Sequence, residues 1–310
     1  MLNGAFVFVP YPFEMGNFCH RYCKCSPVYL PFYSSKRPER ILMSGSVTLR
    51  IFRPRDLDEV HTLITRTIDE SYPPFYSPLA IGFFKKYHQG KQILHDADRG
   101  LTIVLDEGGA IRATGTLVTT NIRRVFVHPE SQRRGYGTVI MRELEAKGVE
   151  KGLRYVDLDA SLFSKKFYLD LHYVIMNHGA YPLREDDLLG YYKMTKNLQP
   201  LDPPQWNLDG MRMRFSDGSG IQKSMERTTA YEFIQKGNFL YGGYRGGKSE
   251  FGEIIGILDG SRVEFSTVQE HLDGTTDHGR INGTVTRGHG GKIHIVDRRD
   301  SKDIRILEEI

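Results

Sequence analysis

The feature that most constrains this chain is a turn of arginine and glycine between an apolar strand and a helix. Residues 121–127 have the composition of a strand, and residues 138–151 are predicted to form a helix. The turn reads Gln132-Arg133-Arg134-Gly135-Tyr136-Gly137. The first turn of a helix has unpaired N–H groups and the positive end of the helix dipole, so phosphate oxygens bind there readily. We therefore predict a phosphate-binding turn at this junction.

Regular patterning begins near residue 46 and extends on both sides of the turn. An amphipathic helix is expected from residue 57 until Tyr72-Pro73-Pro74 ends it, because proline does not continue a helix. Further helices are predicted over 78–88 and 161–171, and strands over 47–51, 101–106, 111–118 and 155–158. This order predicts an α+β fold, with a mixed, mostly antiparallel sheet flanked by helices.

The ordered features from about residue 47 to residue 198 resemble the GCN5-related N-acetyltransferase (GNAT) superfamily. The resemblance rests on the strand end Val125-Phe126-Val127-His128-Pro129, the arginine and glycine turn, and the later segment 161–168. In that family the turn binds the pyrophosphate of acetyl-CoA and the preceding strand contacts the pantetheine arm. The resemblance thus assigns acetyl-CoA to Val125, Phe126, Val127, Gln132, Arg133, Arg134, Gly135, Tyr136, Gly137, Thr138 and Ser161.

The same resemblance implies a catalytic role for Tyr168. This residue aligns with the family tyrosine that protonates the departing thiolate, and a phenol with a pKa of about 10 suits that step. The alternative is an amphipathic tyrosine of the core. Two positions depart from the family pattern: Ser161 stands where an asparagine often touches pantetheine, and His172 stands where a glycine is usual.

The general base and the acceptor site are not fixed by the sequence. The family often has a glutamate on the strand before the turn, where this chain has residues 119–121, Thr-Thr-Asn. A relayed water, or a carboxylate such as Glu70 or Asp159, would serve, and the spacing selects none of them. The aromatic loop 72–76 either encloses an apolar acceptor or closes the core beneath it.

The last hundred residues are predicted to form a second domain. A proline-rich linker is expected over 199–210, and a small antiparallel β-barrel over 211–310, after a domain over 46–198. Short strands are expected over 230–234, 239–244, 251–258, 262–271, 280–287 and 293–296. The segment weakly resembles small lipocalin-like barrel proteins. Ligand binding and a structural or dimerising role both remain open for it.

Residues 1–45 are predicted to be an irregular segment, which is either a flexible leader or, for residues 1–42, chain translated upstream of a true start at Met43. Its prolines interrupt any helical or strand period. Four metal-ligating residues within it are too close together to wrap a tetrahedral ion, and the barrel histidines are scattered, so no metal site is expected. These two sets are Cys19, His20, Cys23 and Cys25, and His271, His278, His289 and His294.

Composition narrows the class of protein. The net charge of +4 comes from 42 basic and 38 acidic residues, which gives no reason to expect a nucleic acid or a membrane as partner. Apolar runs are too short for a membrane helix, and the crowded cysteines indicate a reducing cytoplasm. We predict an N-acetyltransferase that moves an acetyl group from acetyl-CoA to a primary amine of a small molecule or peptide. The alternative is a non-catalytic acyl-CoA sensor with a ligand-binding barrel.

Overall fold

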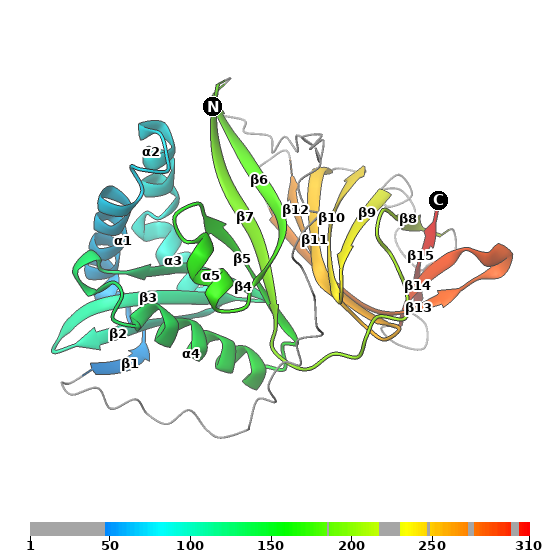
Figure 1. The fold of residues 1–310 in the computed structure, drawn as a ribbon, viewed down its shortest axis with the longest axis horizontal. Helices are drawn as coiled ribbons and strands as arrows, with labels where there is room; N and C mark the ends of the chain where they lie inside the picture. The colour runs from blue at the N-terminus through cyan, green and yellow to red at the C-terminus, as the bar shows by residue number, and fades with distance from the viewer. Residues whose placement is uncertain (1–46, 185, 217–229, 247–248, 272–275, 299–303) are drawn as a thin grey trace, which may run out of the picture.

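A computed structural model describes residues 47–184, 186–216, 230–246, 249–271, 276–298 and 304–310. The predicted leader and its Cys19, His20, Cys23 and Cys25 lie outside these residues, as do the side chains of His271, His278 and His289. The described chain forms a seven-stranded mixed sheet flanked by helices and a closed antiparallel barrel of eight strands (Figure 1). This is the predicted α+β fold.

The sheet has the strand order β1-β2-β3-β4-β5-β7-β6, and only β4 and β5 pair in parallel. Its strands are β1 (Val47–Ile51), β2 (Leu101–Glu107), β3 (Ala110–Val118), β4 (Asn121–Val127), β5 (Tyr155–Ser161), β6 (Val174–Arg184) and β7 (Asp187–Asn197). The long β6–β7 hairpin and its place beside β5 were not in the sequence prediction. It extends the sheet toward the barrel (Figure 1).

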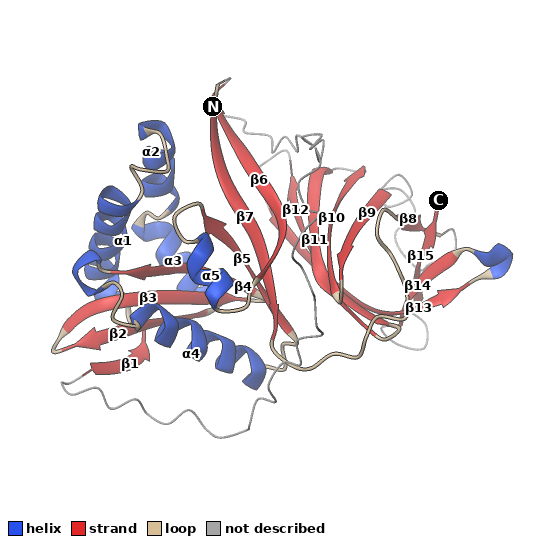
Figure 2. Ribbon diagram, viewed as in Figure 1, coloured by secondary structure: helices blue, strands red, loops and turns tan. Residues whose placement is uncertain are grey.

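Five α-helices cover the two faces of this sheet (Figure 2). One apolar cluster joins the sheet to α4 (Tyr136–Glu150) and α5 (Lys165–Asp170). A second joins it to α1 (Leu57–Ser71), α2 (Pro78–Tyr87) and α3 (Gly90–Arg99). α2 starts where predicted, because Ser77 accepts a hydrogen bond from the Ala80 N–H and Pro78 stands in the first turn.

One helix prediction needs correction, and one helix was missed. The helix predicted over 161–171 begins only at Lys165, because Ser161 ends β5 and its hydroxyl bonds Ser164 in a local turn, at 2.8 Å between the two Oγ atoms. Such serine contacts compete with helical hydrogen bonds. α3 was not predicted. Among the described residues, no helix is long and apolar enough to cross a membrane.

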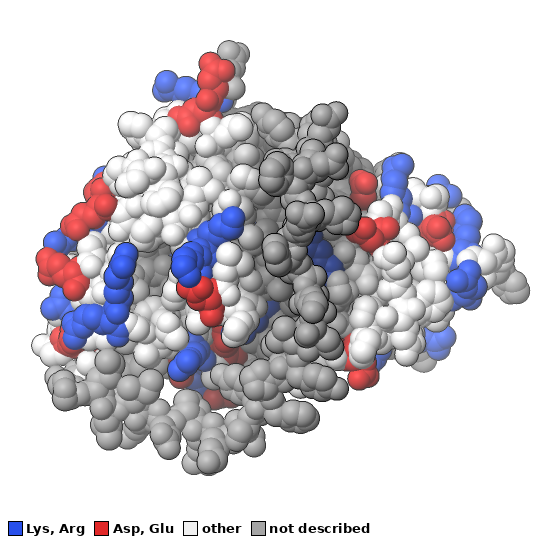
Figure 3. Space-filling model, viewed as in Figure 1, with Lys and Arg blue, Asp and Glu red and all other residues white. Residues whose placement is uncertain are grey.

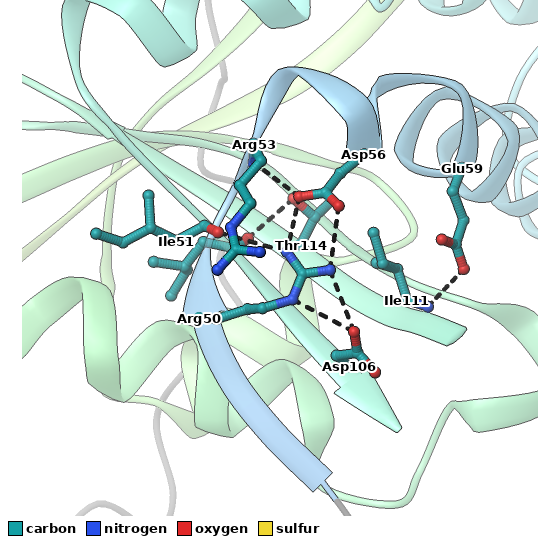
Figure 4. Close-up of polar contacts among 9 residues, drawn as sticks. Arg50, Ile51, Arg53, Asp56, Glu59, Asp106, Ile111 and Thr114 are labelled. Carbon is teal, nitrogen blue, oxygen red and sulfur yellow. Dashed lines mark hydrogen bonds and ion pairs between the residues drawn. The ribbon is translucent and has the colours of Figure 1, made fainter. Parts of the chain in front are cut away.

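A polar cluster fixes the start of α1 against the edge of the sheet (Figure 4). The Arg50 guanidinium donates to Asp56 at 2.7 Å and to Asp106 at 3.1 Å, and the Arg53 N–H donates to Asp56 at 2.7 Å. Although burial opposes ionisation, the Arg50 and Arg53 bonds hold the pKa of Asp56 below its usual value. β1, β2 and α1 are thereby held in one arrangement.

The barrel follows as eight antiparallel strands closed on themselves. They are β8 (Arg212–Phe215), β9 (Ala230–Lys236), β10 (Phe239–Gly246), β11 (Ser249–Asp259), β12 (Arg262–His271), β13 (Thr276–Arg287), β14 (Ile293–Arg298) and β15 (Ile304–Glu309). Apolar side chains of these strands, including Phe233 and Phe265 at 0% exposure, form one buried cluster. At Gly242 an added Cβ would lie 1.8 Å from the Glu232 carbonyl oxygen, so this tight curve requires glycine.

The barrel and the sheet share a buried contact rather than only a linker. The Tyr155 hydroxyl of β5 donates to the Ile255 carbonyl of β11 at 2.9 Å and lies 3.1 Å from the Ser266 hydroxyl. Arg154 forms an ion pair with Asp259. The residues predicted as linker run along the barrel, where the Trp206 indole N–H donates to Ser261 at 3.0 Å.

Candidate active site

The centre of the sheet opens between β4 and β5. The two strands are in register at Asn121 and Asp157. Asp157 closes this junction, because it accepts hydrogen bonds from Thr120 Oγ1 at 2.9 Å and from Asn121 Nδ2 at 2.7 Å. Beyond it no further register pair joins β4 to β5 in the described chain. Val125, Phe126 and Val127, predicted to contact pantetheine, lie on the diverging part of β4.

A bulge at Arg124 bends β4 away from its neighbour. The register with β3 shifts between Thr114 and Thr116, and Arg124 has a φ of 54°, which is strained for a residue with a side chain. The buried guanidinium donates to Asp96 at 2.8 Å and contacts His88 Nδ1 at 2.6 Å. Burial, and then the charge of Arg124, hold the pKa of His88 well below its usual value. A neutral imidazole is therefore available to accept from Arg124.

The arginine and glycine turn presents the backbone of α4. Gly135 is the N-cap with a φ of 85°, and no side chain caps the helix. Nothing lies within 4 Å of the position a Cβ would take there. The N–H groups of Tyr136, Gly137 and Thr138 thus stand at an open helix start, which suits the oxygens of a pyrophosphate. The backbone fits the predicted ligand.

The side chains of the turn bond to neighbouring elements. The assignment of Arg134 to acetyl-CoA stays a prediction, and in the structure its guanidinium pairs with Glu107 at 2.6 Å. The Tyr136 hydroxyl donates to the same carboxylate at 2.6 Å, and these two bonds lower the pKa of Glu107. Gln132 donates to Ser71 and to the Val127 carbonyl, both at 3.3 Å. These contacts fix the turn 132–137 to β2, β4 and α1. The side chain of Arg133 is exposed.

Tyr168 lies on α5 within the core, at 7% exposure. Its ring makes edge contacts with Phe167 at 5.0 Å and Tyr173 at 5.7 Å between centroids. Burial raises its pKa above the usual value for tyrosine, and the nearby Tyr72 adds to this. The Tyr168 hydroxyl makes no hydrogen bond to any described residue. Tyr168 is therefore a buried, protonated phenol whose hydrogen is not used by any described residue.

Ser161 and the aromatic loop 72–76 lie near Tyr168, on the opposite face of β5. Tyr72, at the end of α1, is hydrogen-bonded to Ser161, and burial raises its pKa to about 12. Tyr76 fixes the loop, because its hydroxyl donates to the Gly190 carbonyl at 2.9 Å and accepts from the Leu162 N–H at 2.7 Å. Tyr72 and Tyr76 are buried and help to close the core, while Phe75 is 46% exposed; enclosure of an acceptor by the loop stays a prediction.

The two carboxylates considered as general base occupy different places. Glu70 lies on the outside of α1, paired with Arg66 at 2.6 Å. Asp159 lies on β5, two residues beyond the junction at Asp157, and its carboxylate is 47% exposed and 2.7 Å from Lys193 Nζ. Only Asp159 belongs to the strand that borders the opening.

Sequence reasoning missed the buried partners of the site. Arg124 with Asp96, and Lys193 with Asp159, come from segments far apart in the chain, so no local spacing signals them. One signal was present: Asn121 and Asp157 are polar residues within apolar strand patterns. In the described chain, no group of three or more His, Cys, Asp or Glu side chains is placed to hold a metal ion.

Comparison with known proteins agrees with this geometry. Residues 61–173 match the family model of the acetyltransferase (GNAT) family, and residues 206–306 match that of avidin-like proteins. The matches confirm the resemblance of the first half to GNAT proteins and of the second to small barrel proteins. The GNAT match supports acetyl transfer in general as the activity. No curated protein matches the chain.

Solved structures similar to the chain include three acetyltransferases. A GCN5-related N-acetyltransferase from Rhodopseudomonas palustris is 20% identical, with a TM-score of 0.46, and the match covers 51% of this chain and 99% of that one. The PaiA N-acetyltransferase from Thermoplasma acidophilum, in complex with coenzyme A, is 14% identical, with a TM-score of 0.41, and the match covers 49% of this chain and 99% of that one. The ribosomal-protein-S18-alanine N-acetyltransferase from Escherichia coli is 16% identical, with a TM-score of 0.39, and the match covers 50% of this chain and 95% of that one.

Proposed function

We propose that the protein transfers an acetyl group from acetyl-CoA to a primary amine of a small molecule or peptide. The observations that carry the proposal are the opening between β4 and β5, the uncapped start of α4, and the Tyr168 hydroxyl, which bonds no described residue. A thioester in this opening would lie between a phosphate-binding turn and a proton donor. The matching family model and the solved complex of a similar protein with coenzyme A support acetyl-CoA as co-substrate.

The transfer is direct in this proposal. No cysteine follows Cys25 in the sequence, so a cysteine cannot carry the acetyl group in this half of the chain. The amine nitrogen attacks the thioester carbonyl carbon, the C–N bond forms and the C–S bond breaks, and the nitrogen loses a proton to solvent, which in turn restores the proton of Tyr168. Tyr168 gives its proton to the departing thiolate. Burial raises the pKa of Tyr168, so the phenol holds its proton at neutral pH until the thiolate departs.

Tyr168→Phe tests the catalytic assignment. Loss of the proton donor should lower kcat on the order of 100-fold while the dissociation constant of CoA changes little. Thiol release from acetyl-CoA across a panel of primary amines measures kcat, and calorimetric titration with CoA measures binding. Tyr173→Phe is the matched control, since this buried neighbour donates to Glu145 at 3.0 Å and not toward the opening.

The outcomes separate the enzyme from the sensor. Equal loss in both variants would point to a packing role for Tyr168. Tight binding of CoA without turnover of any amine by the unmodified protein would reject acetyl transfer and favour a non-catalytic acyl-CoA sensor.

A further inference from the structure

The face of β5 and β7 that the barrel covers contains a buried lysine held between two carboxylates. Lys193 of β7 is 7% exposed at its side chain, and its Nζ lies 2.7 Å from Asp159 of β5 and 3.2 Å from Glu253 of the barrel strand β11. Despite burial, Asp159 and then Glu253 hold the pKa of Lys193 well above its usual value. A charged lysine therefore links the transferase sheet to the barrel.

The position of Asp159 relative to the opening is fixed by the strand. Asp157, Asp159 and Ser161 point to the same face of β5, because side chains alternate along a strand. Asp157 marks the last residue joined to β4, and Ser161 contacts Tyr72. Asp159 is thus about 7 Å along the strand from each. It is the first carboxylate on this face beyond the point where β4 and β5 part.

Tyr168 belongs to the opposite face of β5. It packs with Leu158 and Ala160 in the cluster under α4 and α5, whereas Asp159 faces the barrel side. A thioester in the opening would therefore have a carboxylate on one face and a phenol on the other. Direct attack needs this arrangement. A base must take a proton from the amine on the face where the amine approaches, and an acid must give a proton to the thiolate on the face where the thiolate departs.

We propose that Asp159 is the general base for the acceptor amine and that the barrel takes part in catalysis, because its Glu253 holds Lys193, and through it Asp159, in place. The inference rests on the proposed acetyl transfer. An ammonium acceptor gives one proton to Asp159, which passes it to solvent. After attack the nitrogen loses a second proton to solvent, and this replaces the proton that Tyr168 gives to sulfur. Lys193 and Glu253 are positioning residues, and Asp159 is the catalytic one.

The neighbours of Lys193 explain why the carboxylate stays in place. Tyr241 of β10 lies 3.4 Å from Glu253 and accepts a hydrogen bond from Asn177 Nδ2 at 3.3 Å. Tyr191, opposite Ser161 in the register, has its pKa raised by burial and then by the charges of Glu253 and Asp159. Side chains of β5, β7, β10 and β11 therefore surround the lysine, and its ammonium has little freedom to leave Asp159.

Two acceptors of different basicity separate a base from a structural residue. The fastest primary alkylamine of the panel is protonated at neutral pH and needs a base, whereas hydroxylamine is uncharged and does not. Asp159→Asn should lower kcat with the alkylamine on the order of 100-fold and with hydroxylamine by less than about fivefold, after subtraction of the rate without enzyme. Asp170→Asn, at an exposed carboxylate paired with Lys166, is the matched control.

Glu253→Gln tests the part played by the barrel. This variant removes the ion pair that Lys193 makes with the barrel, so the ammonium, and the Asp159 carboxylate 2.7 Å from it, are held in place less firmly. We expect kcat with the alkylamine to fall about tenfold with hydroxylamine turnover and CoA affinity unchanged. Glu232→Gln on β9 is the exposed control and should match the unmodified protein.

The results that overturn the inference are distinct from those that overturn acetyl transfer. If Asp159→Asn affects both acceptors equally, or neither, Asp159 is not the base. If Glu253→Gln behaves as Glu232→Gln, the barrel has no part in catalysis. If the unmodified protein binds CoA and acetylates neither acceptor, the proposed function fails together with the inference.

Discussion

At the scale of residues, the turn before α4 contains two residues with left-handed backbone conformations, one a glycine and the other an arginine. Gly135 and Arg133 both have positive φ values, 85° and 62°. Glycine adopts this region without cost, whereas arginine pays for it. The strain at Arg133 is held by the contacts on either side, from Gln132 to Ser71 and from Arg134 to Glu107. The open backbone of the turn is therefore built into the fold before any ligand arrives.

Gly135→Ala tests this conformation. A side chain at a φ of 85° should cost about 1 to 2 kcal/mol of the free energy of unfolding, measured by urea denaturation. CoA affinity should fall as well, because the N–H groups of the helix start would turn away. Gly82→Ala in α2 is the control, since an added Cβ there meets nothing within 4 Å and the change should be neutral or stabilising. Unchanged stability and CoA affinity in Gly135→Ala would contradict the account.

At the scale of elements, the bulge of β4 keeps the opening in place. Its strained residue, Arg124, is fixed by Asp96 of α3 and by His88 at the end of α2, and Arg123 lies 3.6 Å from the same aspartate. A strand that paired with β5 along its length would close the opening. The ion pair of Arg124 with Asp96 thus helps to shape the proposed cofactor site without contacting it.

Arg124→Met keeps the length of the side chain and removes its charge. Asp96 is buried and would lose its main partner, so the free energy of unfolding should fall by about 3 to 5 kcal/mol. Urea denaturation measures the loss, and calorimetry on the protein that remains folded should show weaker CoA binding. Arg142→Met, on the exposed face of α4, serves as control. A loss no greater than that of Arg142→Met would show that the bulge does not need this anchor.

The sequence predicted the elements better than the site that they enclose. The strands around the turn and the turn itself follow from local patterns, and the structure has them where expected. The contacts that open the sheet do not, because Arg124 and Asp96, or Asp159 and Lys193, meet only after the chain has folded. A local contact can also defeat a local prediction. The helix predicted to begin at Ser161 does not begin there, because the Ser161 hydroxyl bonds Ser164 in a turn.

At the scale of the whole molecule, the barrel and the sheet are joined by contacts that bury polar groups. Tyr155 is 0% exposed, and burial raises the pKa of its hydroxyl although the Ser266 hydrogen bond opposes this. The face seen in Figure 3 carries interspersed charges of both signs, in keeping with the small net charge. The polar contacts that join the two parts include those of Tyr155 and Lys193 and the pair of Arg154 with Asp259.

Tyr155→Phe should weaken this junction. The Ile255 carbonyl and the Ser266 hydroxyl lose a buried partner, at a cost of about 1 to 3 kcal/mol in the free energy of unfolding. Thermal denaturation should show one transition for sheet and barrel in the unmodified protein, and a lower melting temperature in the variant. Tyr87→Phe, at a 46% exposed ring, is the control. Two separate transitions in the unmodified protein would show that the junction does not couple the parts.

The central claim is direct acetyl transfer in the opening between β4 and β5. Mass spectrometry of a single-turnover mixture of the protein, acetyl-CoA and the primary amine panel tests it most directly. The account predicts that an amine gains one acetyl group, that CoA appears in equal amount, and that no acetylated protein accumulates at any time. An acetylated protein that later passes its acetyl group to the amine, or CoA bound with every amine left unmodified, would contradict it.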